Sequence, residues 1–306
     1  MKRTMNAKCF LIILIILASN GHTHAKHNDL TLTHFALSDS LPNNEQTDSL
    51  PNNAQTDSTS FVFFESREEY TRSLIEYNVI NQYENLLAIK TNSPITHPNY
   101  INAASFNVPL DFIDLTGQEI NANQEINANQ EIDTNQEINT NHNIDLHLQQ
   151  LSVPDNQTGK NVRIGLIDTG VNFSHSSLRH VNYVYEEFGE GVTYSHGTDV
   201  TSLIVGNYNE TIRLGAANES TLVVAAMGSI GNYINGDFVA AFEFLITQNV
   251  SIINTSFGGD PRLFDPIIRR LYQKNIIVVG SVGNSGNYTV SGPGSHNLAL
   301  WNMTSH

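Results

Sequence analysis

The sequence contains a single cysteine, Cys9, and that residue lies in an apolar run near the N-terminus. One cysteine cannot form an internal disulfide, so a disulfide-stapled scaffold is excluded. Basic residues are also few, with 15 Lys and Arg against 30 Asp and Glu and a formal net charge of −15. Proteins that bind nucleic acid carry clustered Lys and Arg. The composition therefore argues against a nucleic-acid partner.

The sequence also lacks an apolar run long enough to cross a bilayer, which takes about 20 residues. The run at the N-terminus, CFLIILIILA, covers residues 9–18 and follows Lys2, Arg3 and Lys8. A basic start, a short apolar core and small residues up to Ala25 are typical of a secretory signal. A membrane anchor is the alternative, but the run is too short for one. We expect residues 1–25 to be removed, leaving a secreted or cell-surface protein with no stable membrane span.

The mature chain would contain no cysteine at all, because the only one lies in the predicted signal. Secreted eukaryotic proteins often use disulfides. The absence of cysteine therefore favours a bacterial product.

Two repetitive stretches are too polar to fold into a core. SLPNNEQTD at 40–48 returns as SLPNNAQTD at 49–57, and four hexads of the type QEINAN run from 118 to 141. One Ile per hexad cannot bury enough apolar area to offset the entropy of the chain. We interpret residues 26–59 and 105–148 as low-complexity linkers.

Between the linkers, residues 60–104 have the pattern of a small β-α-β unit. SFVFF at 60–64 and NLLAIKT at 85–91 predict strands, and residues 66–77 predict a helix with Ser66 as its N-cap. This unit has the size of a propeptide. A separate binding module is the alternative.

Beyond the second linker, residues 149–306 alternate between two patterns. Four short apolar runs predict strands buried on both faces, as in a parallel sheet. They lie at 162–167, 221–226, 251–257 and 276–282. Helical patterns lie at 236–249 and 260–275, the second with Asp260 as N-cap and Pro261 at its first position. The fold class predicted is α/β, with a doubly wound, mostly parallel sheet.

Four polar residues are expected near the carboxyl ends of these strands, where sites form in open parallel sheets. Asp168 and Asn284 each follow a strand, Ser256 ends one, and His196 begins a helical pattern. Each residue alone also fits an ordinary turn or cap. Together they suit acyl transfer, because a carboxylate can orient an imidazole base and an amide can stabilise an oxyanion.

The blocks VRIGLIDTGVNFSHSSL, SHGTDVTSLIVG, SIINTSFGG and NIIVVGSVGNSGN resemble, in order and spacing, those of the subtilisin-like serine proteases (subtilases). The resemblance implies a serine endopeptidase that takes a peptide or protein substrate, with Asp168 as the orienting acid, His196 as the general base and Asn284 as the oxyanion donor. It also implies substrate binding by Ser256, Phe257, Gly258 and, in GSIGN, Gly231.

The resemblance extends to two further features of the chain. Residues 60–104 loosely resemble the inhibitory propeptide of the family, and the DTGVNFSH wording resembles the lantibiotic leader peptidases within it. Calcium is common in the family, but no calcium ligand or other metal site can be placed in this sequence, and no other cofactor is identifiable.

The nucleophile block of the family, of the type GTSMA, does not occur in these 306 residues. Ser295 follows Asn284 by only eleven residues and better matches the stretch that leads to the next strand of the family. No helix follows Ser305, and Ser256 belongs to the substrate strand, so we reject all three as nucleophiles. Our leading hypothesis is a subtilase cut short before its nucleophile and inactive as it stands. The alternatives are a site completed by another chain and a non-catalytic secreted peptide-binding protein (a pseudoprotease).

Overall fold

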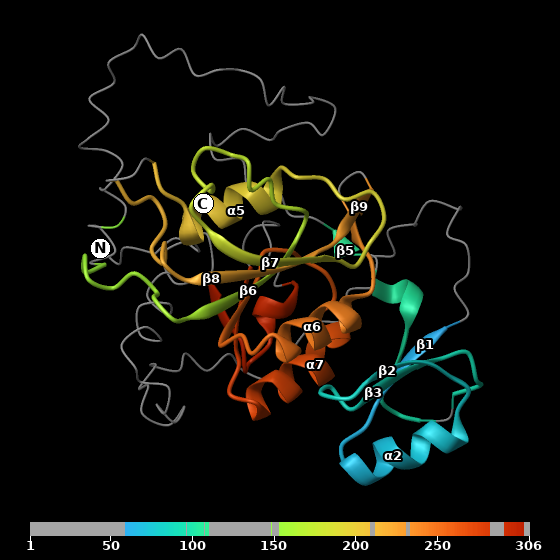
Figure 1. Ribbon diagram of the computed structural model, residues 1–306. Helices are drawn as coiled ribbons and strands as arrows, with labels where there is room; N and C mark the ends of the chain where they lie inside the picture. Colours follow the sequence, from blue (N-terminus) through green and yellow to red (C-terminus); the bar gives the residue numbers. More distant parts are fainter. Residues whose placement is uncertain are drawn as a thin grey trace, which may run out of the picture.

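A computed structural model describes residues 59–95, 97–106, 108–109, 148, 153–208, 212–230, 233–281 and 291–302. These residues form a four-stranded, a three-stranded and a six-stranded sheet (Figure 1). The predicted signal, nearly all of both predicted linkers, Gly231 and Asn284 lie outside the described residues.

The N-terminal module is an antiparallel sheet in the order β2-β3-β1-β4, with one helix. Its elements are β1 (Ser60–Phe63), α2 (Arg67–Glu76), β2 (Val79–Tyr83), β3 (Ala88–Thr91) and β4 (Tyr100–Asn102). Ser66 is the N-cap, as predicted: its Oγ accepts from the Glu69 N–H, and Glu69 Oε2 accepts from the Ser66 N–H, both at 3.2 Å. The strand β2 is not predicted by the sequence pattern, because its residues are mostly exposed and carry no apolar pattern.

The six-stranded sheet has the order β13-β12-β11-β6-β8-β7, and every neighbouring pair is parallel. Its strands are β6 (Arg163–Asp168), β7 (Asn182–Glu187), β8 (Thr221–Ala226), β11 (Ile252–Thr255), β12 (Ile277–Ser281) and β13 (Leu300–Asn302). The predicted fold class is confirmed. The sequence pattern does not predict β7, because this edge strand is polar and has no fully buried residue.

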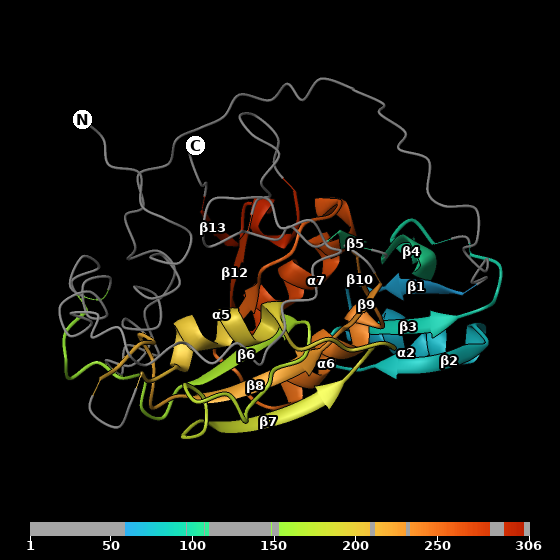
Figure 2. The same cartoon turned by 90° about the horizontal axis from the view of Figure 1, so that it is seen from above.

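Helices cover both faces of this sheet (Figure 2). Alternate residues of β6 point to opposite sides: Ile167 joins the core under α6 and α7, whereas Leu166 joins the core under α5. The bounds of the helices are α5 (His196–Val205), α6 (Phe238–Thr247) and α7 (Pro261–Gln273). Asp260 caps α7 as predicted, accepting from the Arg262 N–H at 2.9 Å. The parallel, doubly wound arrangement brings the carboxyl end of β6 next to the start of α5.

A small sheet links the module to the larger domain. It contains β5 (Val108–Pro109), β10 (Tyr233–Asn235) and β9 (Gly228–Ile230), and both pairings are antiparallel. Through β5, the chain that leaves the module pairs directly with residues that follow β8.

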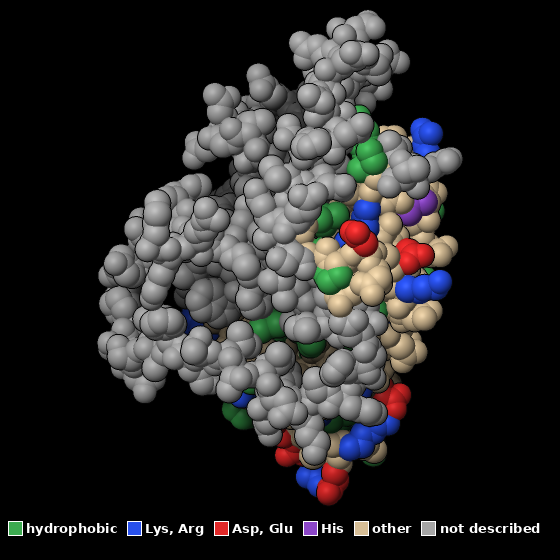
Figure 3. Space-filling model, turned by 90° about the vertical axis from the view of Figure 1, so that its left-hand side faces the viewer, with side chains coloured by type: hydrophobic (Ala, Val, Ile, Leu, Met, Phe, Trp, Pro, Cys, Tyr) green, Lys and Arg blue, Asp and Glu red, His purple; other side chains and the backbone are tan. Residues whose placement is uncertain are grey.

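The surface of the described residues carries charges of both signs, as one side shows (Figure 3). On α2, Arg72 bridges Glu68 and Arg67 contacts Glu84, with all four side chains at least 60% exposed. Exposed pairs of this kind contribute about 0–1 kcal/mol each. The stability of the fold therefore depends on its cores.

The module and the larger domain share one apolar core. Phe106, at the end of the 3-10 helix η2 (Ala103–Phe106), contacts Phe61 of the module and both Phe238 and Phe264 of the larger domain. The three ring-centroid distances lie between 5.6 and 5.8 Å, and Phe106 is 3% exposed. The Phe106 side chain thus contacts α6, α7 and the module at the same time.

We expect Phe106→Ala to lower the free energy of unfolding by about 3–5 kcal/mol, because it leaves a cavity among aromatic rings. Chemical denaturation with circular dichroism checks this. Ile75→Ala is the control, because Ile75 is 87% exposed and its truncation should change little. Equal effects of the two substitutions would contradict a shared core at Phe106.

Candidate active site

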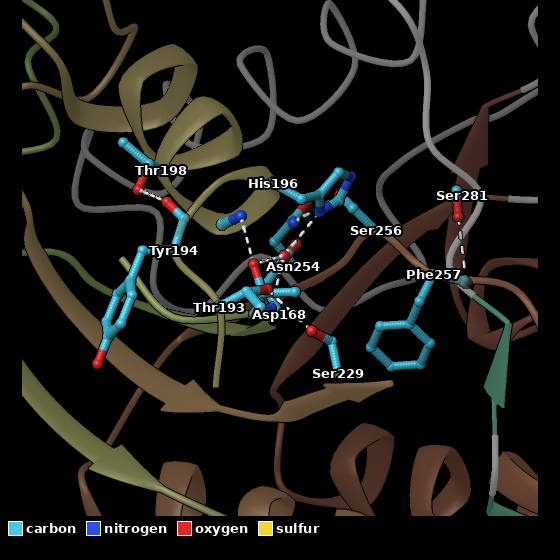
Figure 4. A network of polar contacts seen from close by, with 12 residues as sticks. Asp168, Thr193, Tyr194, His196, Thr198, Ser229, Asn254, Ser256, Phe257 and Ser281 are labelled. Carbon is cyan, nitrogen blue, oxygen red and sulfur yellow. Dashed lines mark hydrogen bonds and ion pairs between the residues drawn. The ribbon is translucent and has the colours of Figure 1, made fainter. Parts of the chain in front are cut away.

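Asp168 and His196 form a hydrogen-bonded pair in this structure (Figure 4). Asp168 is the last residue of β6 and His196 is the first of α5, and His196 Nδ1 lies 2.6 Å from Asp168 Oδ1. The Asp168 side chain is 0% exposed and that of His196 is 11% exposed. A buried carboxylate that accepts from Nδ1–H leaves Nε2 as the unprotonated nitrogen of the neutral ring.

Thr169 ties the pair to the helix that carries His196. The Thr169 N–H donates to Asp168 Oδ1 at 2.7 Å, and its Oγ1 accepts from the Gly197 N–H at 2.8 Å. The first N–H groups of a helix have no partner within it, and Ser195 makes no side-chain cap here. Thr169 therefore satisfies a donor of α5 and orients the carboxylate at the same time.

Gly197 is required by a close approach of backbones. A Cβ built at this position would lie 2.4 Å from the Thr169 carbonyl oxygen, a distance that real Cβ atoms do not reach. Nearby, Thr198 Oγ1 donates to the Tyr194 carbonyl and accepts from the Asn172 N–H. Neither Thr169 nor Thr198 is among the site residues predicted from the sequence, although the DTG and HGTD motifs contain them.

The predicted substrate strand lies at the end of β11. Ser256 Oγ accepts from the Asn254 side-chain amide at 2.9 Å and is partly buried. The Phe257 side chain is 0% exposed, and its ring packs against Phe238 and Phe264. The main chain of Phe257 is equally buried, and its carbonyl oxygen accepts from Ser281 Oγ at 3.1 Å.

The structure describes some of the other residues predicted from the sequence and leaves others outside its described ranges. Gly258 is buried next to Gly292, whereas Gly231 and Asn284 lie outside the described residues. Ser295, rejected as a nucleophile, lies in the 3-10 helix η3 (Pro293–Ser295), and its Oγ donates to the Gly292 carbonyl at 2.8 Å. The structure thus brings Asp168 and His196 together and places Ser256 at the end of a central strand.

Within the described ranges, no group of three or more His, Cys, Asp or Glu side chains could hold a metal ion. The buried Asp168 Oδ2 has no hydrogen-bond partner there, and this one atom does not make a calcium site. Among the same residues, no helix is long and apolar enough to span a membrane.

The fold and the site together define the class of protein. It is a doubly wound α/β domain with a carboxylate–imidazole pair at the carboxyl end of a central strand. The profile of the subtilase family matches residues 159–303, so this part of the chain is similar to that family. The match includes β6 and α5, which carry the pair, and β11, which neighbours β6 in the sheet.

Curated relatives support the same assignment. Subtilisin DY of Bacillus licheniformis is 32% identical over 136 residues, covering 42% of this chain and 49% of the relative. Subtilisin E of Bacillus subtilis (strain 168) is 29% identical over 138 residues, covering 42% of this chain and 36% of the relative. The chain thus spans about half or less of the length of these relatives.

Solved structures with some similarity include the patellamide maturation protease PatA, at 21% identity and a TM-score of 0.39. The alignment covers 46% of this chain and 56% of that one. The prenylagaramide maturation protease PagA gives 20% identity and a TM-score of 0.39, covering 46% and 52%.

We expect Thr169→Val to expose the Gly197 amide to solvent exchange, because the substitution removes its acceptor and leaves the methyl groups in place. The lost bond should also lower the free energy of unfolding by about 1–3 kcal/mol. Hydrogen exchange followed by NMR measures both effects. Thr169→Ser, which keeps the hydroxyl, should retain the protection of Gly197. Unchanged protection in Thr169→Val would show that Thr169 does not hold the helix.

Proposed function

We propose that this chain belongs to a secreted, bacterial subtilisin-like serine endopeptidase, and that Asp168 and His196 are its acid–base pair. The observation that carries the proposal is the 2.6 Å contact between His196 Nδ1 and the buried Asp168 carboxylate. In this role, Asp168 fixes the tautomer of His196 and stabilises its protonated form. His196 Nε2 takes the proton of the attacking hydroxyl and returns it to the leaving amine.

The other roles follow from the family resemblance. Asn284 donates to the developing oxyanion, and the main chain of Ser256, Phe257 and Gly258 pairs with an extended peptide whose other side faces Gly231.

The nucleophile is not assigned to any serine of this sequence, because no GTSMA-type block occurs in the 306 residues. Without it, a peptide can bind but no acyl-enzyme can form. We therefore propose that these residues alone bind peptides without hydrolysing them.

We further propose that the N-terminal module is the propeptide of a zymogen, folded onto the peptidase domain. Glu243 of α6 supports this, because its carboxylate accepts three hydrogen bonds from the module. Asn85 N–H and its side-chain amide donate to Oε1 at 2.8 and 2.9 Å, and Leu86 N–H donates to Oε2 at 3.0 Å. Tyr83 adds a hydrogen bond of 2.8 Å to Asp237, the N-cap of α6.

Burial and the neighbouring Asp237 carboxylate raise the pKa of Tyr83 above its ordinary value. The phenol therefore stays protonated, as a hydrogen-bond donor must. The module thus contacts α6 through the carboxylates of Glu243 and Asp237, and Lys90 adds an ion pair with Asp237 at 3.9 Å. Its exit strand β5 pairs with β10.

Peptide binding by the 306-residue chain tests the proposed substrate cleft, which we place along Ser256, Phe257 and Gly258. A set of extended fluorescent peptides should contain members that bind, measured by anisotropy. Methylation of alternate backbone amides should weaken the best of them about tenfold, because about two main-chain hydrogen bonds of 0.5–1.5 kcal/mol each are lost.

A serine-directed fluorophosphonate serves as the parallel assay and should not label the chain. Labelling of Ser295 or Ser256, or cleavage of a peptide, would overturn the absence of a nucleophile.

Glu243→Gln tests the docking of the module. The substitution places an amide N–H2 where an acceptor is needed, so we expect the Leu86 amide to lose protection from hydrogen exchange by at least about tenfold. Glu76→Gln, on the exposed face of α2, is the matched control and should change nothing. If both variants retain full protection, Glu243 does not hold the module.

A further inference from the structure

An aromatic pocket of about 430 Å³ lies beside the Asp168–His196 pair and has no role in the mechanism above. Three segments build it: the loop after Asp168, the edge strand β7, and the residue two positions before His196. The pocket is lined by Val171, Asn172, Phe173, Ser174, Tyr183, Tyr185 and Tyr194.

The rings of this pocket are fixed against each other but remain open to solvent. Phe173 stacks on Tyr183 with ring centroids 3.6 Å apart and planes 3° apart, and Tyr185 meets Phe173 edge-on at 6.4 Å. Tyr183 and Tyr194 are nevertheless 51% and 49% exposed. Clustered aromatic surface that stays exposed in a folded domain is typical of a binding site.

One carboxylate and one guanidinium border the pocket. The Tyr185 hydroxyl donates to Glu187 Oε1 at 3.1 Å, so a carboxylate lies next to the aromatic wall. Burial, followed by the bond to Glu187, raises the pKa of Tyr185, which keeps its hydroxyl as a neutral donor. None of the lining residues is charged. Arg179 is near the rim, where its Nε donates to the Ser174 carbonyl at 3.3 Å.

Aromatic faces combined with a nearby carboxylate attract cations, through the ring quadrupole and through charge. A cation gains about 0.5–2 kcal/mol from such rings, depending on how far it is desolvated. An apolar side chain would gain from the rings alone and nothing from Glu187. The combination of tyrosines and Glu187 therefore favours a basic group over a neutral one.

The pocket shares its walls with the segments that hold the proposed acid–base pair. A Cβ at Gly170 would lie 2.7 Å from the Tyr194 ring, so the ring packs directly on the DTG turn. Tyr194 lies on the opposite side of Asp168 and His196 from Ser256 and Phe257 (Figure 4). A peptide held at Ser256 that passes the pair therefore brings a neighbouring side chain towards this pocket.

We propose that the pocket receives a lysine or arginine side chain of the peptide that occupies the cleft. This inference rests on the proposed function, because the peptide itself is part of that proposal. It makes Tyr183, Tyr194 and Glu187 specificity-determining residues that select a basic side chain at one position of the substrate.

Matched peptide pairs test the proposal on the intact 306-residue chain. One set carries lysine at each position in turn and the partner set carries norleucine, which keeps most of the alkyl stem and removes the charge. Arginine and citrulline form a second pair. At one position we expect the basic peptide to bind about tenfold more tightly, measured by fluorescence anisotropy.

Two variants connect that preference to the pocket. Tyr194→Ala removes a half-exposed ring and Glu187→Gln removes the charge. Each should make the lysine and norleucine peptides bind within about twofold of each other, without weakening the norleucine peptide. Tyr208→Ala is the control, because Tyr208 is 52% exposed and is not among the lining residues. It should preserve the preference.

The outcomes separate this inference from the proposed function. Equal binding of basic and neutral peptides to the unaltered chain, or a preference that survives both variants, would overturn the assignment of the pocket. If no peptide binds at all, the proposed cleft fails instead. The pocket is then tested alone with butylammonium against butanol. Selective shifts of the Tyr183 and Tyr194 ring resonances by butylammonium would support a cation site, and equal or absent shifts would refute it.

Discussion

The close approach between the end of β6 and the start of α5 determines the rest of the site. Asp168 is fully buried and His196 almost so, and their contact requires the two backbones to meet at Gly197. Thr169 then takes the place of a helix cap, since its hydroxyl accepts from Gly197 while its N–H holds the carboxylate. Any side chain at position 197 would separate the acid from the base.

The segments that hold the Asp168–His196 pair also contact the apolar core on one side and the aromatic pocket on the other. On one side, Phe257 and Phe106 continue the core under α6 and α7 into the module. The residues that dock the module therefore belong to the same core that packs against the sheet. On the other side, Tyr194 packs on the DTG turn and opens an aromatic pocket towards β7. A side chain bound in that pocket, as proposed above, would contact the same segments that hold Asp168 and His196.

Much of the fold was predictable because its signals are local. The apolar run before Asp168 is buried on both faces, and Asp260 followed by Pro261 starts a helix without reference to any distant residue. The predicted helix 236–249 begins instead at Phe238, because Asp237 accepts from the Ala240 N–H and acts as its N-cap. The strand β7 was missed because an edge strand with exposed tyrosines carries no continuous apolar run.

The sequence by itself determined the alternation of strands and helices, the caps, and which polar residues follow which strands, because each depends on side chains within a few positions. Only the tertiary structure decided that Asp168 and His196 meet, that Thr169 serves a helix 28 residues away, and that Tyr183 of an edge strand faces Phe173. These contacts join residues far apart in the chain. Their distances follow from the parallel sheet and its crossovers, which no local pattern encodes.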